Sequence, residues 1–138
     1  MKGLRVLIIE DEPLIALLYE DVLSELGHEV CASEYTQAGA IAAASCHRPD
    51  LIIADMRLNE GSGIDALKAI LTTGFVPHVF VSGDRLALTQ ADTAAVTLQK
   101  PFNERQLVKA ISSAMDPANV LIGEKLAHSS RTPDPQVE

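Results

Sequence analysis

Short segments of strand character that end on a polar residue constrain the fold of this chain more than any other feature of its sequence. The three most apolar segments are 5–9, 51–54 and 78–81. A continuous apolar run of this length is typical of a strand buried on both faces, as in a parallel sheet covered by helices. Weaker segments of the same kind cover 29–33 and 96–99. The sequence therefore predicts five strands.

Helical patterns separate these segments. Pro13 suits the first turn of a helix, and apolar residues follow it at helical spacing until Gly27. The apolar positions of this first helix are Ile15, Leu18, Val22 and Leu26. Further helices are predicted over residues 37–46, 64–71, 86–95 and 104–115, with Thr36 and Asn103 as N-caps. Five strands alternating with about five helices predict an α/β fold, a doubly wound parallel sheet with helices on both faces.

The length and charge of the chain exclude several classes of protein. Its 138 residues fit one domain, and 11 Lys and Arg against 19 Asp and Glu give a net charge of −8, which disfavours direct nucleic-acid binding. No apolar run approaches the roughly 18 residues of a membrane span, so no membrane segment is expected. Cys31 and Cys46 lack metal-ligand spacing and are interpreted as two buried thiols of a cytoplasmic protein rather than as a disulfide.

Polar residues that follow four of the predicted strands define the candidate site. They are Glu10 and Asp11, Asp55, Ser82 and Lys100. In open parallel sheets, ligands bind at the carboxyl ends of the strands, near the point where the winding reverses. Three carboxylates gathered there repel each other unless a cation lies among them, and Mg²⁺ prefers such oxygen ligands. Lys100 and Ser82 suit a phosphoryl group, and Asp55, at the end of the most apolar strand, is the best candidate nucleophile.

Five short motifs in a fixed order give the chain a resemblance to a known family. They are IEDEP at 9–13, IAD at 53–55, GSG at 61–63, VSG at 81–83 and KPF at 100–102. Together they resemble the receiver domains of two-component response regulators, over about residues 6–115. The resemblance implies a flavodoxin-like sheet of strand order 2-1-3-4-5 and a receiver domain that covers residues 1–117.

The resemblance also implies a phosphoryl-transfer role. Asp55 would accept a phosphoryl group from a histidine kinase or a histidine phosphotransfer protein. Ser82 and Lys100 would bind the phosphoryl oxygens, and the peptide bond between Lys100 and Pro101 would be cis. Thr97 stands where the family usually has an aromatic residue that rotates on activation, so an aromatic switch is not expected. Such a protein is not an enzyme with external substrates, because it catalyses only its own phosphorylation and dephosphorylation.

A Mg²⁺ site follows from the same resemblance. Asp11 and Asp55 would bind the ion directly, Glu10 would bind it through water, and the backbone carbonyl of Arg57 would be a further ligand. Arg57 lies two residues after Asp55, and Asp84 lies two residues after another strand end. Both side chains are therefore expected at the mouth of the site, where their opposite charges would pair and modulate the lifetime of the phosphoryl group.

Residues 118–138 are interpreted as a largely disordered extension that is too short for an output domain. The chain is therefore expected to be a stand-alone receiver or a fragment of a larger regulator. Phosphorylation would switch its contact with an unidentified downstream protein, and the chain itself would be a monomer or a weak dimer.

The same residues bear on other possible functions. The main alternative is a Mg²⁺-dependent phosphohydrolase that forms an aspartyl phosphate, but Arg57 stands where such enzymes usually carry a second Asp. A dinucleotide-binding domain needs a G-x-G-x-x-G turn after the first strand, and residues 10–13 are Glu-Asp-Glu-Pro instead. A degenerate receiver used only for protein contact ranks low, because all five site residues are present.

Overall fold

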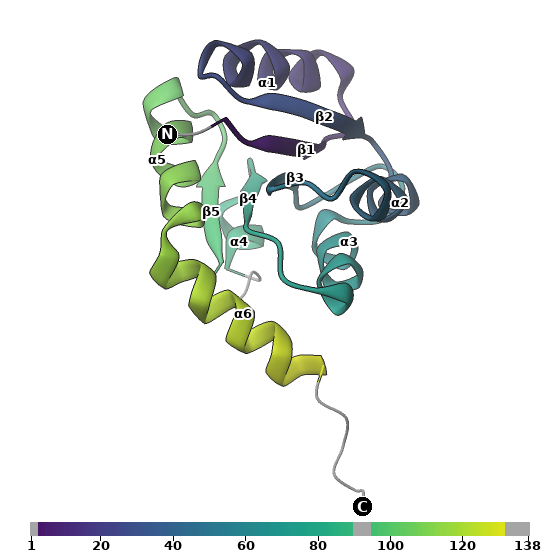
Figure 1. Cartoon of the computed structure of the whole chain (residues 1–138). Coiled ribbons are helices and arrows are strands. Elements are labelled where there is room, and N and C mark those ends of the chain that lie inside the picture. The colour runs from purple at the N-terminus through teal and green to yellow at the C-terminus, as the bar shows by residue number, and fades with distance from the viewer. Residues whose placement is uncertain (1–2, 90–94, 132–138) are drawn as a thin grey trace, which may run out of the picture.

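A single parallel sheet of five strands forms the centre of the computed structural model, which describes residues 3–89 and 95–131 (Figure 1). The strands are β1 (Arg5–Ile9), β2 (Glu29–Glu34), β3 (Leu51–Asp55), β4 (His78–Ser82) and β5 (Val96–Gln99). Their order in the sheet is β2-β1-β3-β4-β5, and every neighbouring pair is parallel. The predicted fold class and strand order are therefore confirmed.

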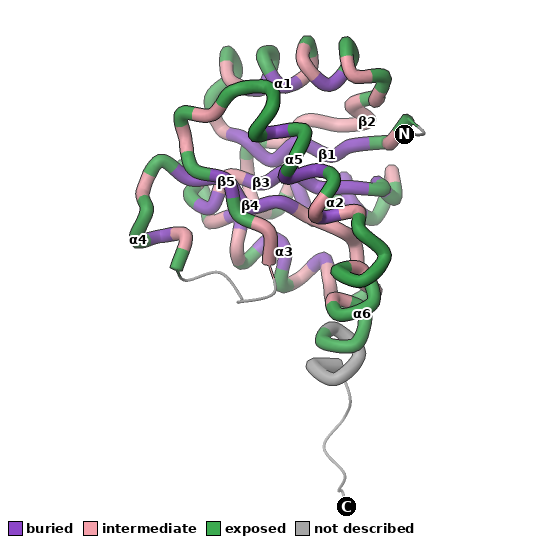
Figure 2. The backbone as a smooth tube through the Cα atoms, turned by 90° about the vertical axis from the view of Figure 1, so that its left-hand side faces the viewer, coloured by how far each residue is buried: buried purple, intermediate pink, exposed green. Residues whose placement is uncertain are grey.

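Helices cover both faces of this sheet. They are α1 (Pro13–Glu25), α2 (Gln37–His47), α3 (Gly63–Ile70), α4 (Arg85–Leu88), α5 (Glu104–Met115) and α6 (Pro117–Arg131), with a 3₁₀ turn, η1 (Leu71–Thr73), after α3. One apolar core lies between the sheet and the helices α1 and α5, and a second lies between the sheet and α2, α3 and α4. The central strands β1, β3 and β4 are mostly buried because helices cover both faces of the sheet, whereas the edge strands β2 and β5 are partly exposed, as are the outer turns of the helices (Figure 2).

Most of these helices begin at a residue whose side chain caps the first turn. Thr36 accepts a hydrogen bond from the backbone N–H of Gly39 at the start of α2. Asn103 forms a reciprocal capping box with Gln106 at the start of α5. Each cap satisfies backbone donors that the first turn of a helix leaves without partners. Both predicted N-caps are confirmed.

The core-facing side of α1 agrees only in part with the prediction, because Ile15 and Val22 pack against the core whereas Leu18 does not. The residues of α1 that the core buries are Ala16, Tyr19 and Leu23, whereas Leu18 is 59% exposed. The prediction placed Leu18 on the core-facing side because it lies at helical spacing from Ile15 and Val22. The helix carries apolar side chains on two adjacent faces, so the pattern alone does not identify the buried face. Tyr19 is buried where its ring stacks with Phe102, with ring centroids 6.0 Å apart.

The two remaining differences concern α4 and the C-terminal segment. The helix predicted over 86–95 spans only Arg85–Leu88, and residues 90–94 of that prediction lie outside the described residues. The segment from 118 onward, predicted to be largely disordered, continues as α6 up to Arg131. It contacts α5 and η1, and Gly123 lies so close to Phe75 that a Cβ atom there would meet the aromatic ring. Within the described residues, no helix has both the length and the apolar character to span a membrane.

Candidate functional site

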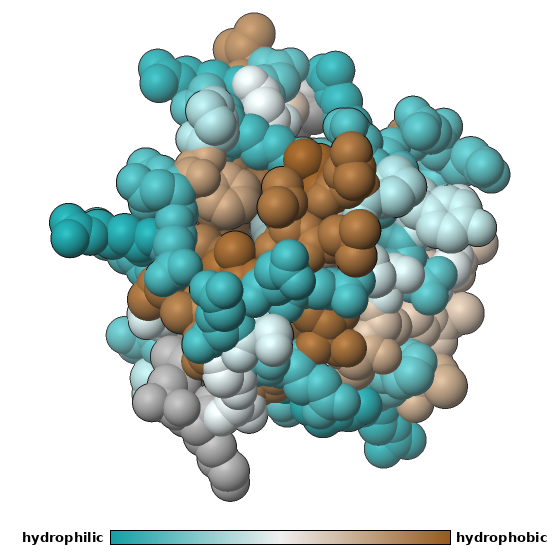
Figure 3. Space-filling view, turned by 90° about the horizontal axis from the view of Figure 1, so that it is seen from above, coloured by the Kyte–Doolittle hydropathy of each residue, from teal (hydrophilic) through white to brown (hydrophobic). Residues whose placement is uncertain are grey.

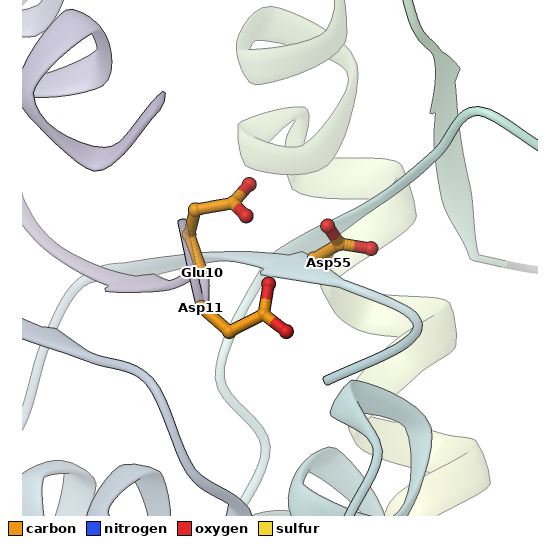
Figure 4. A group of neighbouring side chains, drawn as sticks. All are labelled: Glu10, Asp11 and Asp55. Carbon is orange, nitrogen blue, oxygen red and sulfur yellow. The ribbon is translucent and has the colours of Figure 1, made fainter. Parts of the chain in front are cut away.

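Three carboxylates meet at the carboxyl edge of the sheet. Glu10 and Asp11 follow β1, Asp55 ends β3, and the two strands are neighbours. Each of the three residues offers a carboxylate oxygen that lies within 4.8 Å of the other two (Figure 4). The chain passes from β1 to β2 on one side and reaches β3 on the other, so the cluster lies where the winding reverses. This is the position at which open parallel sheets bind ligands.

Lys100 joins the carboxylates from the end of β5. Its Nζ lies 3.0 Å from Oδ2 of Asp55 and 3.2 Å from Oε1 of Glu10. Burial alone would lower the pKa of Lys100, but the hydrogen bond and charge of Asp55, together with the charge of Glu10, outweigh it, so the pKa is raised. The lysine is thus held in its charged form. Three carboxylates and one ammonium group leave a formal charge of −2 when all are ionised.

The position of Glu10 makes this charge costly. Glu10 is one of only two buried polar residues among those described. Burial raises its pKa, an effect that Lys100 opposes and that the charge of Asp55 reinforces. Its Oε2 also accepts a hydrogen bond from the backbone N–H of Glu12. The cluster therefore offers several oxygen donors and an excess of negative charge, which fits a hard divalent cation.

Ser82 and its neighbours form the other side of the site. Ser82 is buried at the end of β4, and its Oγ accepts a hydrogen bond from the backbone N–H of Asp84 at 3.0 Å. One carboxylate oxygen of Asp84 accepts from the N–H of Leu86 and caps α4, while the other lies 3.1 Å from the guanidinium of Arg57. The predicted pair of Arg57 and Asp84 is therefore formed, with side chains 75% and 41% exposed.

The loop after β3 contributes contacts that the sequence did not reveal. The backbone N–H of Arg57 donates to Oδ1 of Asp55, and that of Asn59 donates to Oδ2 of Asp11 at 2.7 Å. A Cβ atom on Gly63 would lie only 1.9 Å from the carbonyl oxygen of Asp55, so α3 begins directly against the backbone of Asp55. Asn59 was missed because it acts through its backbone, which leaves no signal in the side-chain pattern.

The predictions for Pro101 and Thr97 concern the backbone around Lys100. The peptide bond between Lys100 and Pro101 is cis. Thr97 is an exposed residue of β5 and pairs with Phe80 of β4 in the sheet register. The structure therefore brings together Glu10, Asp11, Asp55 and Lys100 as one contact group, with Ser82, Asp84 and Arg57 beside it.

Comparison with known proteins agrees with this geometry. The family model described as the response regulator receiver domain matches residues 6–112. The phyllosphere-induced regulator PhyR of Methylorubrum extorquens is 39% identical over 80% of this chain and 43% of its own length. The transcriptional regulatory protein PdtaR of Mycobacterium tuberculosis is 34% identical over 80% of this chain and 56% of its own length. The chain thus spans about half the length of these two relatives.

A solved structure supports the same assignment. The receiver domain of the Erythrobacter litoralis response regulator PhyR has a TM-score of 0.76 and 36% sequence identity, and the match covers 83% of this chain and 92% of that domain. The family model covers nearly the whole of the doubly wound sheet, including every strand-end residue of the site. The chain therefore belongs to the family of response regulator receiver domains.

Proposed function

We propose that this protein is a phosphoacceptor in two-component signal transduction, and that Asp55 receives the phosphoryl group from a histidine kinase or a histidine phosphotransfer protein. The observation that carries the proposal is the contact of Asp55 with Lys100 beside Glu10 and Asp11. The Asp55 side chain is 14% exposed, so a phosphoryl group can reach it from solvent. A carboxylate oxygen of Asp55 attacks phosphorus while the P–N bond of a phosphohistidine that is protonated on its other ring nitrogen breaks, so the donor histidine leaves as neutral imidazole.

The acidic cluster holds Mg²⁺ in this proposal. Asp11 and Asp55 would hold it directly, Glu10 would hold it through water, and the backbone carbonyl of Arg57 would be a further ligand. The formal charge of −2 and the oxygen donor set support this ion. When bound, Mg²⁺ neutralises charge that develops on the phosphoryl oxygens. Lys100 contributes a positive charge on the other side of Asp55, and the hydroxyl of Ser82 is available to donate to a phosphoryl oxygen.

The exposed side of α1 supports docking of a helical phosphodonor. Leu14, Leu17 and Leu18 are 76%, 54% and 59% exposed. Seen from above in the frame of Figure 1, apolar side chains gather into one patch bordered by hydrophilic residues (Figure 3). Glu20 and Asp21 flank the leucines in the sequence, and α1 begins next to the carboxylate cluster. A donor helix with an apolar stripe and basic flanks complements this surface.

The direct test is incubation with a small-molecule phosphodonor and Mg²⁺, followed by intact mass measurement. The expected result is the gain of one phosphoryl group. No gain is expected when a chelator is present before the phosphodonor is added. A protein that instead releases phosphate continuously without retaining a phosphoryl group would support the alternative, a Mg²⁺-dependent phosphohydrolase. That alternative lacks a second Asp two residues after the nucleophile, where this chain has Arg57.

The pair of Arg57 and Asp84 is expected to slow the loss of the phosphoryl group. Arg57 and Asp84 each contact a residue of the site through the backbone N–H, Arg57 at Asp55 and Asp84 at Ser82, so the pair lies beside the acceptor. An exposed ion pair contributes only about 0–1 kcal/mol to stability, so its loss should leave the fold intact. Arg57→Ala and Asp84→Ala are each expected to accelerate dephosphorylation. The decay of the phosphorylated protein, followed by intact mass, gives the rates for both variants and for the double variant.

The double variant decides whether the two side chains act as a pair. If they do, its rate departs from the product of the single effects by at least about twofold, the size of a coupling of about 0.5 kcal/mol. Asp84 also caps α4, so Asp84→Asn, which keeps an oxygen for the N–H of Leu86, separates the charge from the cap. If the rate change of the double variant equals the product of the two single changes, Arg57 and Asp84 do not act as a pair.

Ser82 is expected to transmit phosphorylation to the segment that follows β4. Its hydroxyl can donate to a phosphoryl oxygen while its oxygen contacts the N–H of Asp84, which in turn caps α4. Because α4 has only four residues, few contacts hold this segment. Hydrogen exchange on phosphorylation is expected to change most in residues 83–97, of which 90–94 lie outside the described residues.

Ser82→Ala provides the control for this route. The variant is expected to retain some labelling of Asp55 but to lose the change in hydrogen exchange over residues 83–97. The largest change falling on α1 or α2 instead would mean that the output surface lies elsewhere. Thr97 has no aromatic ring to rotate, so the backbone of this segment is the reporter in the proposal.

The remaining features of the proposal concern partners and location. The net charge of −8 favours a protein as the downstream partner over direct contact with nucleic acid. Cys31 and Cys46 are free thiols, which suits a cytoplasmic protein, but they are not buried as predicted, because Cys31 is half-buried and Cys46 is exposed. The chain acts as a monomer or weak dimer, and its own phosphorylation and dephosphorylation are the only reactions that it catalyses.

A further inference from the structure

The loop between β3 and α3 carries the carbonyl of Arg57 and is held at three points. At its start, the N–H of Arg57 donates to Asp55. In its middle, the N–H of Asn59 donates to Asp11. The third point lies outside the carboxylate cluster, at Gln37, the first residue of α2. The first two contacts involve the proposed metal ligands themselves, whereas the third comes from a residue with no chemistry of its own at the site.

Gln37 contacts the end of this loop through both its side chain and its backbone. Its side-chain Oε1 accepts a hydrogen bond from the N–H of Ser62 at 3.1 Å. Its backbone N–H donates to the carbonyl of Glu60, also at 3.1 Å. Gly61, with φ of +93°, lies between these two bonds, and a Cβ atom there would be 2.4 Å from Oε1 of Gln37. The loop therefore fits against the Gln37 side chain with no space for a larger residue.

This contact also determines where α3 begins. Ser62, whose N–H is held by Gln37, caps α3 by accepting a hydrogen bond from the N–H of Asp65. The next residue, Gly63, packs directly against the carbonyl of Asp55 and donates its N–H to the carbonyl of Met56. The loop is thus closed at both ends, and Gln37 is the contact that ties its far end to a second helix.

We propose that Gln37 is a positioning residue of the metal site, which holds the loop so that the carbonyl of Arg57 and the N–H of Asn59 face the carboxylates. This inference rests on the proposed function. Mg²⁺ requires near-ideal octahedral geometry, so a ligand carbonyl on a loosened loop has to be ordered again when the ion binds. That ordering weakens the apparent affinity in proportion to the population of the competent loop conformation.

The test compares variants that isolate the acceptor oxygen of Gln37. Gln37→Met keeps a side chain of similar size against Gly61 but cannot accept the bond, whereas Gln37→Glu keeps an acceptor. Gln106→Ala is a matched control, because Gln106 also accepts a backbone N–H at the start of a helix but does not touch this loop. Two quantities are measured on the whole chain: hydrogen exchange of residues 57–62 without metal, and Mg²⁺ affinity by titration.

Gln37→Met is expected to accelerate exchange at residues 57–62 and to weaken Mg²⁺ binding by about two- to tenfold, the range that corresponds to one lost hydrogen bond. Gln37→Glu is expected to keep both the exchange rate and the Mg²⁺ affinity near their wild-type values, and Gln106→Ala is expected to change neither. Unchanged exchange in Gln37→Met, or faster exchange with unchanged Mg²⁺ affinity, would overturn the role of Gln37. If the wild-type protein binds no Mg²⁺, the metal site of the proposed function fails instead, which the titration of the wild type shows separately.

Discussion

Asp55→Asn is expected to abolish the gain of one phosphoryl mass that the wild-type protein shows with a phosphodonor and Mg²⁺. The amide is not a nucleophile toward phosphorus, whereas its oxygen still provides an acceptor for the ammonium group of Lys100. The fold should therefore persist while labelling falls below detection. Intact mass measures the labelling, and a thermal melt shows that the variant is folded.

A second aspartate next to the same strand provides the control. Asp50 lies at the opposite end of β3, where its carboxylate accepts the N–H of Arg5 at 2.8 Å. Asp50→Asn makes the same chemical change far from the carboxylate cluster and is expected to leave labelling intact. Undiminished labelling of Asp55→Asn would show that another group accepts the phosphoryl group.

Replacement of Asp11 is expected to have the next largest effect, on metal binding. Loss of a direct ligand should weaken Mg²⁺ binding by more than about tenfold, because even outer-shell partners cost about 10–100-fold. Without metal, removal of the Asp11 charge should raise the melting temperature, because one of three mutually repelling carboxylates is removed. Titration with Mg²⁺ and thermal melts in chelator measure the two effects.

Two replacements separate charge from hydrogen bonding at this position. Asp11→Asn keeps an acceptor for the N–H of Asn59, whereas Asp11→Ala loses a bond worth about 0.5–1.5 kcal/mol. Without metal, Asp11→Asn is therefore expected to melt above the wild type, and Asp11→Ala to melt below Asp11→Asn. If either variant binds Mg²⁺ as tightly as the wild type, the ion does not bind at this cluster.

Much of the fold and of the site was predictable because its causes are local. Each strand is a short apolar run, and in a parallel sheet all strands of this kind end at one edge. The residues that follow them, such as Asp55 and Lys100, must therefore converge even though they are 45 positions apart. The same argument correctly predicted that Arg57 and Asp84 lie within ion-pair distance. Capping by Thr36 and Asn103 depends only on the next turn of helix.

The sequence by itself thus determined the α/β class, the strands and the cluster of polar residues at their carboxyl ends. Only the tertiary structure decided which face of α1 is buried, because Leu18 and Tyr19 are both apolar enough to face a core. It also decided that residues 117–131 form a helix, which packs against Phe75 through a contact distant in sequence. The hydrogen bond from the N–H of Ser62 to the side chain of Gln37 likewise joins the loop before α3 to the start of α2, 25 positions away. Such contacts depend on where whole elements lie in three dimensions, and no short-range pattern encodes that placement.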